Sequence, residues 1–498
     1  MRKEPMTERD FDLLLETSLP EVPPSDVTKW VNPWRTAMDR ILLGFAFQGI
    51  TLHFFLLQYI LPAIGSVLLV LGFRSLRKEN LWFRLCYVIS LFGLALTLVT
   101  LMANGTIYGG GVTQFLLGYT VPLLGVDLCQ YLFFWLGFRA VRKKAGLEPG
   151  AASAFALLVW NGIICWLALL EVGDMYLVIG IGILVVYLCI LRCLWVLSTQ
   201  LDEAGYAVQA APVRVEDGLL VKVLAGVLVV GLAVGYVFFD SYPMEWTAAE
   251  ETGHDSTIHD HLIDLGMPAQ VAADLTQEDL LACAGATEVL VDQSLHPFNP
   301  GREVVTTRGY ERFITFVYDV QELQITGVAV RLDDDTWKII HHFQWVVDPG
   351  FRGTESLRFW PAYRNSEGWA FEDGWTGQLL YEQEGQTYTA PFYCMEEEAY
   401  SGVSMFGDAY TATDVFAQFS LPDDGENHRG YAAYTIREVQ EGWLVNSWMN
   451  YTHQLSSIQF PAQTAVDHEK SGAWDNYKFK TIQDALQFSI REGVPEVW

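Results

Sequence analysis

Long apolar runs fill the first half of the chain, and they constrain its fold more than any other feature. A helix needs about 20 mostly apolar residues to cross a bilayer. Such runs lie near residues 50–73, 82–103, 114–138, 152–171, 175–197 and 218–239. We therefore expect residues 41–239 to form an all-α membrane bundle of about six spans, in contact with the lipid bilayer.

The start of this region is less regular than the rest. Residues 1–40 form a polar tail, and the apolar run 41–73 contains Pro62, where we expect the helix to break. Two arrangements stay open. The run is an interfacial helix leading into one span, or a bent re-entrant hairpin that keeps the tail in the cytoplasm.

Charge divides the chain near residue 240. The net charge is −28, and residues 240–498 contain 14 Lys and Arg against 42 Asp and Glu, so this region carries all of it. A region this acidic repels nucleic acid, because phosphate binding requires basic side chains. We therefore expect no nucleic-acid partner.

Basic residues in the short loops predict the orientation of the bundle. They follow the first run at Arg74, Arg77 and Lys78, and the third run over residues 139–144, whereas loops 104–112 and 172–174 contain none. Loops rich in Lys and Arg stay in the cytoplasm. The pattern predicts a multi-pass cell-membrane protein with residues 240–498 outside the cytoplasm.

The second half has the pattern of a soluble domain. Residues 240–254 are expected to be a linker and residues 255–286 a small helical module. From residue 287 to 498, short runs rich in Val, Ile, Thr and aromatic residues alternate with turns, which predicts a mainly antiparallel β-sandwich or barrel-like sheet. The stretch KTIQDALQFSIREG near the end predicts an amphipathic C-terminal helix. The fold class is thus a membrane bundle followed by an α+β, mainly β, domain.

Polar residues inside the apolar runs are candidate functional residues. Asp127 lies in the third run, Asn161 in the fourth and Lys222 near the start of the sixth. One interpretation is an ion or proton site at Asp127, with Asn161 or Lys222 as its partner. The other is a single buried carboxyl group that orders the bundle, with Lys222 extending to the membrane surface.

An aromatic segment in the second half suggests a ligand site. Its candidate residues are Arg358, Trp360, Tyr363, Trp369 and Trp375. Flat rings flanked by polar groups suit an envelope glycan or a peptide or protein ligand. The alternative is core packing, because Trp is common inside β-sandwiches.

Three histidines and two cysteines leave further questions open. His254, His259 and His261 are weak metal candidates, because their spacing does not place them on one face of a helix. A polar helix start with solvated histidines explains them better, and we predict no metal or cofactor. Cys283 and Cys394 can pair only if this region is exported.

Recognisable catalytic motifs are absent from the sequence. We find no HExxH, GxSxG, Walker A or strand-linked GxGxxG pattern. Three hypotheses follow: a cell-surface sensor or ligand-binding protein, a transporter or channel-like bundle with a regulatory ectodomain, and an envelope enzyme without a known motif. The sequence leaves enzymatic activity undecided and favours the first.

Two segments carry a resemblance to other proteins. They are ITLHFFLLQYILPAIGSVLLVLGFRSLRKEN at residues 50–80 and NHRGYAAYTIREVQEGWLVNSWMNYTHQ at residues 427–454. Together they resemble uncharacterised multi-pass membrane proteins of Gram-positive anaerobic bacteria with a C-terminal β-rich domain. The resemblance implies a bacterial protein with the same architecture, and it implies no activity.

Overall fold

A computed structural model provides the structure of the chain. It describes residues 33–497 except 51–54, 170–175, 205, 207, 209–210, 213–214, 250–255, 309–310, 334, 352, 362–367, 404–406, 408, 441, 474 and 492–493. The chain divides into two compact units. One comprises Met1–Ala103 and Gly111–Leu232, and the other Asn104–Gly110 and Ala233–Trp498. We call them the helical unit and the β-rich unit.

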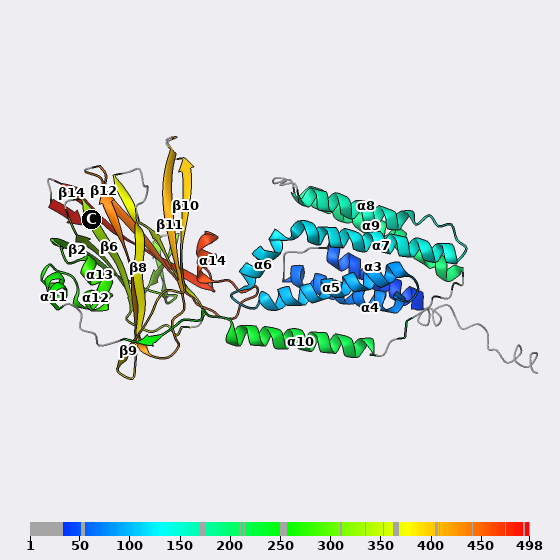
Figure 1. Ribbon diagram of the computed structural model, residues 1–498, viewed down its shortest axis with the longest axis horizontal. Helices are drawn as coiled ribbons and strands as arrows, with labels where there is room; N and C mark the ends of the chain where they lie inside the picture. The colour runs from blue at the N-terminus through cyan, green and yellow to red at the C-terminus, as the bar shows by residue number, and fades with distance from the viewer. Residues whose placement is uncertain are drawn as a thin grey trace, which may run out of the picture. The chain divides into compact units, whose positions relative to one another are not determined.

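The helical unit confirms a membrane-type helical region (Figure 1). Within the described residues, five helices are long and apolar enough to cross a bilayer: Leu57–Leu76, Leu81–Ala103, Thr120–Lys144, Gly180–Glu203 and Asp217–Phe238. The predicted span near 152–171 corresponds to a shorter helix of 17 residues. The helices are α3 (Pro33–Gly49), α4 (Leu57–Leu76), α5 (Leu81–Ala103), α6 (Gly109–Gly118), α7 (Thr120–Lys144), α8 (Ala152–Ala168), α9 (Tyr176–Glu203) and α10 (Asp217–Phe238).

The apolar run 41–73 is a pair of helices, and its break is not at Pro62. Helix α3 ends at Gly49, and α4 begins at Leu57 and continues through Pro62. The two helices pack closely because they meet at glycines. A Cβ atom on Gly72 would lie 2.8 Å from the Ala37 carbonyl oxygen. The expected break at Pro62 is therefore wrong, because α4 continues unbroken through this residue.

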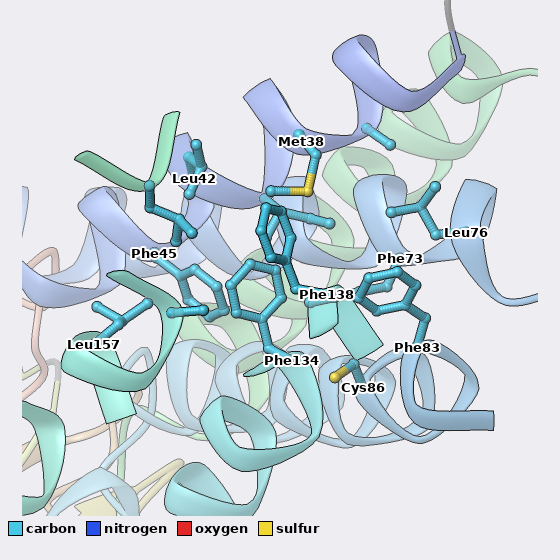
Figure 2. Close-up of a cluster of buried hydrophobic side chains, with 14 of the residues drawn as sticks. Met38, Leu42, Phe45, Phe73, Leu76, Phe83, Cys86, Phe134, Phe138 and Leu157 are labelled. Atoms are coloured by element: carbon cyan, nitrogen blue, oxygen red, sulfur yellow. The ribbon is translucent and has the colours of Figure 1, made fainter. Parts of the chain in front are cut away.

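Aromatic rings form the core of the helical unit. Figure 2 shows side chains from α3, α4, α5, α7 and α8 converging on one cluster. Phe45 and Phe134 lie edge to face with ring centroids 5.4 Å apart, and Phe73 packs against both. Such pairs add roughly 0.5–1.5 kcal/mol beyond the burial of their area. This cluster fixes how α3, α4, α5 and α7 pack around the site described below.

The β-rich unit confirms the predicted mainly antiparallel β domain. A seven-stranded sheet has the order β1-β9-β8-β12-β6-β5-β2, and a six-stranded sheet has the order β10-β11-β7-β13-β14-β15. The first contains β1 (Thr247–Ala248), β9 (Gln386–Ala390), β8 (Trp369–Gln383), β12 (Glu426–Glu438), β6 (Thr336–Trp345), β5 (Leu323–Arg331) and β2 (Glu288–His296). The second contains β10 (Cys394–Val403), β11 (Ala409–Phe419), β7 (Glu355–Trp360), β13 (Val445–Gln454), β14 (Phe479–Arg491) and β15 (Val494–Val497). Strands β3 (Arg302–Arg308) and β4 (Glu311–Val317) form a separate hairpin.

The two large sheets pack face to face as a sandwich. Phe343, Leu379 and Ala432 of the seven-stranded sheet share one buried cluster with residues of the other sheet, such as Phe359 and Tyr451. Three short helices, α11 (Ser256–Asp264), α12 (Ala269–Asp274) and α13 (Gln277–Ala282), pack on the outer face of the seven-stranded sheet (Figure 1). Helix α14 (Ala465–Lys470) packs against β7 and β13 of the six-stranded sheet.

The predicted C-terminal helix is wrong. Residues 480–491 of the stretch KTIQDALQFSIREG lie in β14, which pairs with β13 from Phe479 opposite Gln454 to Phe488 opposite Val445. Its buried hydrophobic residues Ile482, Leu486 and Phe488 are separated by even numbers of positions, four and then two. This is the alternation of a half-buried strand, because successive side chains in a strand point to opposite faces.

Candidate functional site

A cavity of about 200 Å³ opens between four helices of the helical unit, and Gln48 and Asp127 are exposed at its rim. Its polar lining comes from Gln48 of α3, Ser66 of α4, Ser90 of α5, and Asp127 and Gln130 of α7. Leucine, isoleucine, valine and phenylalanine side chains complete the walls. Four separate helices contribute to this cavity. Its shape is therefore set by the contact between α3 and α4 and by the aromatic cluster around Phe45, Phe73 and Phe134.

Side chains around this cavity are joined in two short networks. The Gln48 Nε2 amide donates to Ser66 Oγ (3.2 Å), and Ser66 Oγ lies 3.3 Å from Thr97 Oγ1. On the opposite wall, Gln130 Nε2 donates to Ser90 Oγ (3.1 Å). In each network the glutamine uses its amide nitrogen, so its amide oxygen stays available as an acceptor.

Asp127 differs from these neighbours, because its carboxylate makes no hydrogen bond or ion pair with the described residues. It lies one helical turn from Gln130, and residues three apart in a helix share a face. A carboxylate without a partner inside a membrane-spanning helix is costly, which is why such groups mark ion or substrate sites. The cavity thus combines one negative charge with neutral oxygen acceptors.

The two partners predicted for Asp127 do not join it. The Asn161 side chain donates to the Leu157 carbonyl oxygen of its own helix (2.8 Å). Lys222 lies exposed on α10, and neither residue lines the cavity. The residues that do surround Asp127 were missed. Their sequence signal is weak, since single Ser and Gln residues in apolar helices are common.

The aromatic segment is divided between different environments. Arg358 and Trp360 lie together on β7, with the guanidinium carbon 4.1 Å from the indole centroid. Trp369 is buried and donates to the Trp443 carbonyl oxygen (3.0 Å), and Trp375 packs against Tyr434 between the sheets. Tyr363 lies outside the described residues. Of the four candidates that the structure describes, Arg358 and Trp360 therefore meet.

The Arg358–Trp360 pair has its interactions satisfied within the protein. Arg358 Nε donates to Asp414 Oδ2 (3.1 Å), and its guanidinium covers one face of the Trp360 ring. A sugar ring would need an open aromatic face, and an anionic ligand would need an unpaired cation. At this position Arg358 already covers one face of the ring, and its charge is balanced by Asp414.

The predicted metal and disulfide candidates do not form sites in the described part of the chain. His254 lies outside it. His259 contacts Asp260 (3.3 Å), and His261 Nε2 lies 2.9 Å from the Ala286 carbonyl oxygen. Among the described residues, no group of three metal-ligating side chains is found. Cys283 is buried and Cys394 is partly exposed, and both are free thiols.

Two buried carboxylates attach the short helices to the sandwich. Asp279 at the start of α13 accepts from Lys338 Nζ (2.7 Å) and from the Thr376 hydroxyl (2.6 Å). Asp274 at the end of α12 accepts from Arg429 Nε (2.9 Å) and lies 2.9 Å from His342 Nε2. None of these pairs was predictable from the sequence, because each joins residues far apart in the chain.

These two carboxylates stay charged despite their burial. Burial raises the pKa of Asp279, but Lys338 and the neighbouring hydroxyls outweigh it and hold the pKa below its ordinary value. For Asp274, burial is likewise outweighed by His342 and Arg429, so its pKa is also lowered. Both ion pairs therefore have a structural role and are already satisfied.

Comparison with known proteins leaves the function to be argued from geometry. No protein-family model matches the chain, and no curated protein sequence matches it. At the Asp127 cavity the described residues include a carboxylate that no ion pair or hydrogen bond with another described residue neutralises.

Proposed function

We propose that this chain is a cell-membrane binding protein, acting as a sensor, that holds a monovalent cation at Asp127. The carboxylate without a partner in a polar cavity is the observation that supports this proposal. Neutral oxygen ligands of the kind that hard cations prefer come from the amide oxygens of Gln48 and Gln130 and from the Ser90 hydroxyl oxygen. The cation neutralises the carboxylate and thereby stabilises one arrangement of the four helices.

The charge of the ion follows from the charge of the site. One carboxylate balances one positive charge, whereas a divalent ion would leave a net charge in a region of low dielectric constant. The ligands are oxygen atoms, so the softer metals that favour thiolate and imidazole do not suit the site.

The β-rich unit is placed outside the cytoplasm in this proposal. The basic residues of the loops that follow α4 and α7 support this orientation. A ligand of the β-rich unit, whether glycan, peptide or protein, is not included, because the Arg358–Trp360 surface is internally paired.

Binding is tested with the full chain purified in detergent, using radioactive sodium and rubidium as probes. We expect the wild type to bind one of the two saturably, and Asp127→Asn to lose that binding. The control is Asn161→Ala, which removes a mid-helix polar group outside the cavity and should bind as the wild type does. Equal binding by Asp127→Asn, or no saturable binding by the wild type, would overturn the proposal.

The same variants separate a sensor from a transporter. The chain is reconstituted into sealed vesicles, and uptake of the bound ion is followed down a concentration gradient. A sensor binds the ion without moving it across the membrane. Uptake that depends on Asp127 would instead make the chain a transporter or channel-like protein, using the same site.

A further inference from the structure

A second cavity, of about 600 Å³, lies between α10 and the helices α4 and α5. Of the residues of α10, all of which the structure describes, only Gly235 is buried. The helix approaches α5 near its C-terminal end, where a Cβ atom on Gly231 would lie 2.2 Å from Met102. Near its N-terminal end, Asp217 bonds Arg40 (2.6 Å). Between these two attachments the helix stands apart and leaves an open crevice.

The crevice has a basic end and an apolar end. Arg74, Arg77 and Lys78 line the first. The second is formed by apolar side chains from three helices: Val70, Leu91, Leu94, Leu220 and Leu224. This arrangement follows the direction of α4, because Val70 lies about 9 Å before the end of the helix at Leu76, and Arg77 and Lys78 follow that end.

The charge at the basic end is only partly neutralised. Asp217 is shared between Arg40 and Arg74, the latter at 3.4 Å. Arg77 donates to the Pro212 carbonyl oxygen (3.1 Å), which leaves its charge unbalanced. In the described part of the chain, no carboxylate pairs with Arg77 or Lys78. One carboxylate, that of Asp217, therefore faces four basic side chains: Arg40, Arg74, Arg77 and Lys78.

We infer that this crevice binds an anionic phospholipid. The phosphate lies against Arg77 and Lys78, and one acyl chain lies along the leucines of α5 and α10. Basic pockets between membrane helices bind anionic headgroups, and the volume is in the range of ordinary ligand sites. Apolar walls that continue into a membrane-spanning helix favour a lipid over a soluble phosphate compound, since only a lipid fills both ends.

The test uses the full chain in detergent with added phosphatidylglycerol or phosphatidylcholine, and native mass spectrometry counts the retained lipids. We expect the wild type to retain phosphatidylglycerol preferentially. The double variant Arg77→Gln/Lys78→Gln should weaken that retention about 10- to 30-fold, as expected for two lost surface charges. The control Arg139→Gln/Lys143→Gln removes two basic residues at the end of α7, away from the crevice, and should keep it.

A second variant addresses the apolar end. Leu224→Trp fills the crevice without changing its charge, and we expect it to reduce phosphatidylglycerol retention as well. Unchanged retention in this variant would show headgroup binding at the surface alone and would overturn the crevice site. Inorganic phosphate that displaces phosphatidylglycerol at millimolar concentration would also overturn the inference, in favour of a soluble anion.

Discussion

Replacing Asp279 by Asn tests whether the buried ion pair holds the short helices on the sandwich. Asp279 is fully buried, Lys338 is 6% exposed, and their charged atoms are 2.7 Å apart. The variant leaves the ammonium group of Lys338 buried beside a neutral amide. Removing one partner of a buried pair costs about 3–5 kcal/mol, because the remaining charge has lost its compensation. We therefore expect α13 to detach far more often.

Cys283 provides a direct measurement of this detachment. It follows α13, is fully buried, and burial raises the pKa of its thiol to about 11, so it reacts only when the helix opens. A loss of about 3 kcal/mol corresponds to an increase of about 150-fold in the opening equilibrium. Alkylation of the full chain in detergent, resolved by peptide mass spectrometry, gives the labelling rate of this cysteine alone.

The control and the compensating variant make this prediction specific. Asp264→Asn alters an exposed acid on α11 and should leave the labelling rate unchanged. The double variant Asp279→Leu/Lys338→Met removes both charges and should recover most of the loss. Labelling of Cys283 at the wild-type rate in Asp279→Asn, or equally accelerated labelling in Asp264→Asn, would contradict a role of the ion pair in holding α13.

Three further predictions follow from other described residues. Burial between the sheets lowers the pKa of His341 to about 4. Its full contribution to the free energy of unfolding is therefore present above pH 6.5 and falls by up to about 3 kcal/mol towards pH 4, because the unfolded chain takes up a proton that the folded chain excludes. In His341→Gln, hydrogen exchange of the β6 amides should lose part of this pH dependence. Gly72→Ala should separate α3 from α4 and lower the melting temperature in detergent, because its Cβ atom would meet the Ala37 carbonyl, whereas Gly162→Ala, with open space around it, should be neutral or stabilising. Reporter fusions after residues 78 and 144 should be cytoplasmic and a fusion at the C-terminus external, and a cytoplasmic C-terminus would contradict the orientation.

The large-scale division of this chain was predictable, because it depends on properties that add along the sequence. Runs of about 20 apolar residues and the charge of residues 240–498 need no knowledge of contacts. Strand assignments such as β6 and β12 followed from local composition as well. The errors arose where two periodicities compete. In β14, Ile482, Ala485 and Leu486 fit a helical face, although Leu486, Phe488 and Ile490 also alternate. Pairing with β13 selects the strand, and this partner is invisible to a local pattern.

The candidate site shows the same limit for polar residues. Asp127 was identifiable because an acid in a membrane helix is rare, whereas Gln48 and Ser90 acquire meaning only when α3 and α5 bring them to the same cavity. The expected partners Asn161 and Lys222 were chosen by their depth in neighbouring runs. Which side chains face each other depends instead on the rotation of each helix about its axis. Packing of aromatic side chains such as Phe45, Phe73 and Phe134 sets that rotation. The aromatic segment gives the converse case: Trp369 and Trp375 suggested a binding surface, but the alternation of β8 directs them into the sandwich. Unpaired charge is therefore the more reliable guide here, and it selects Asp127 over the tryptophans.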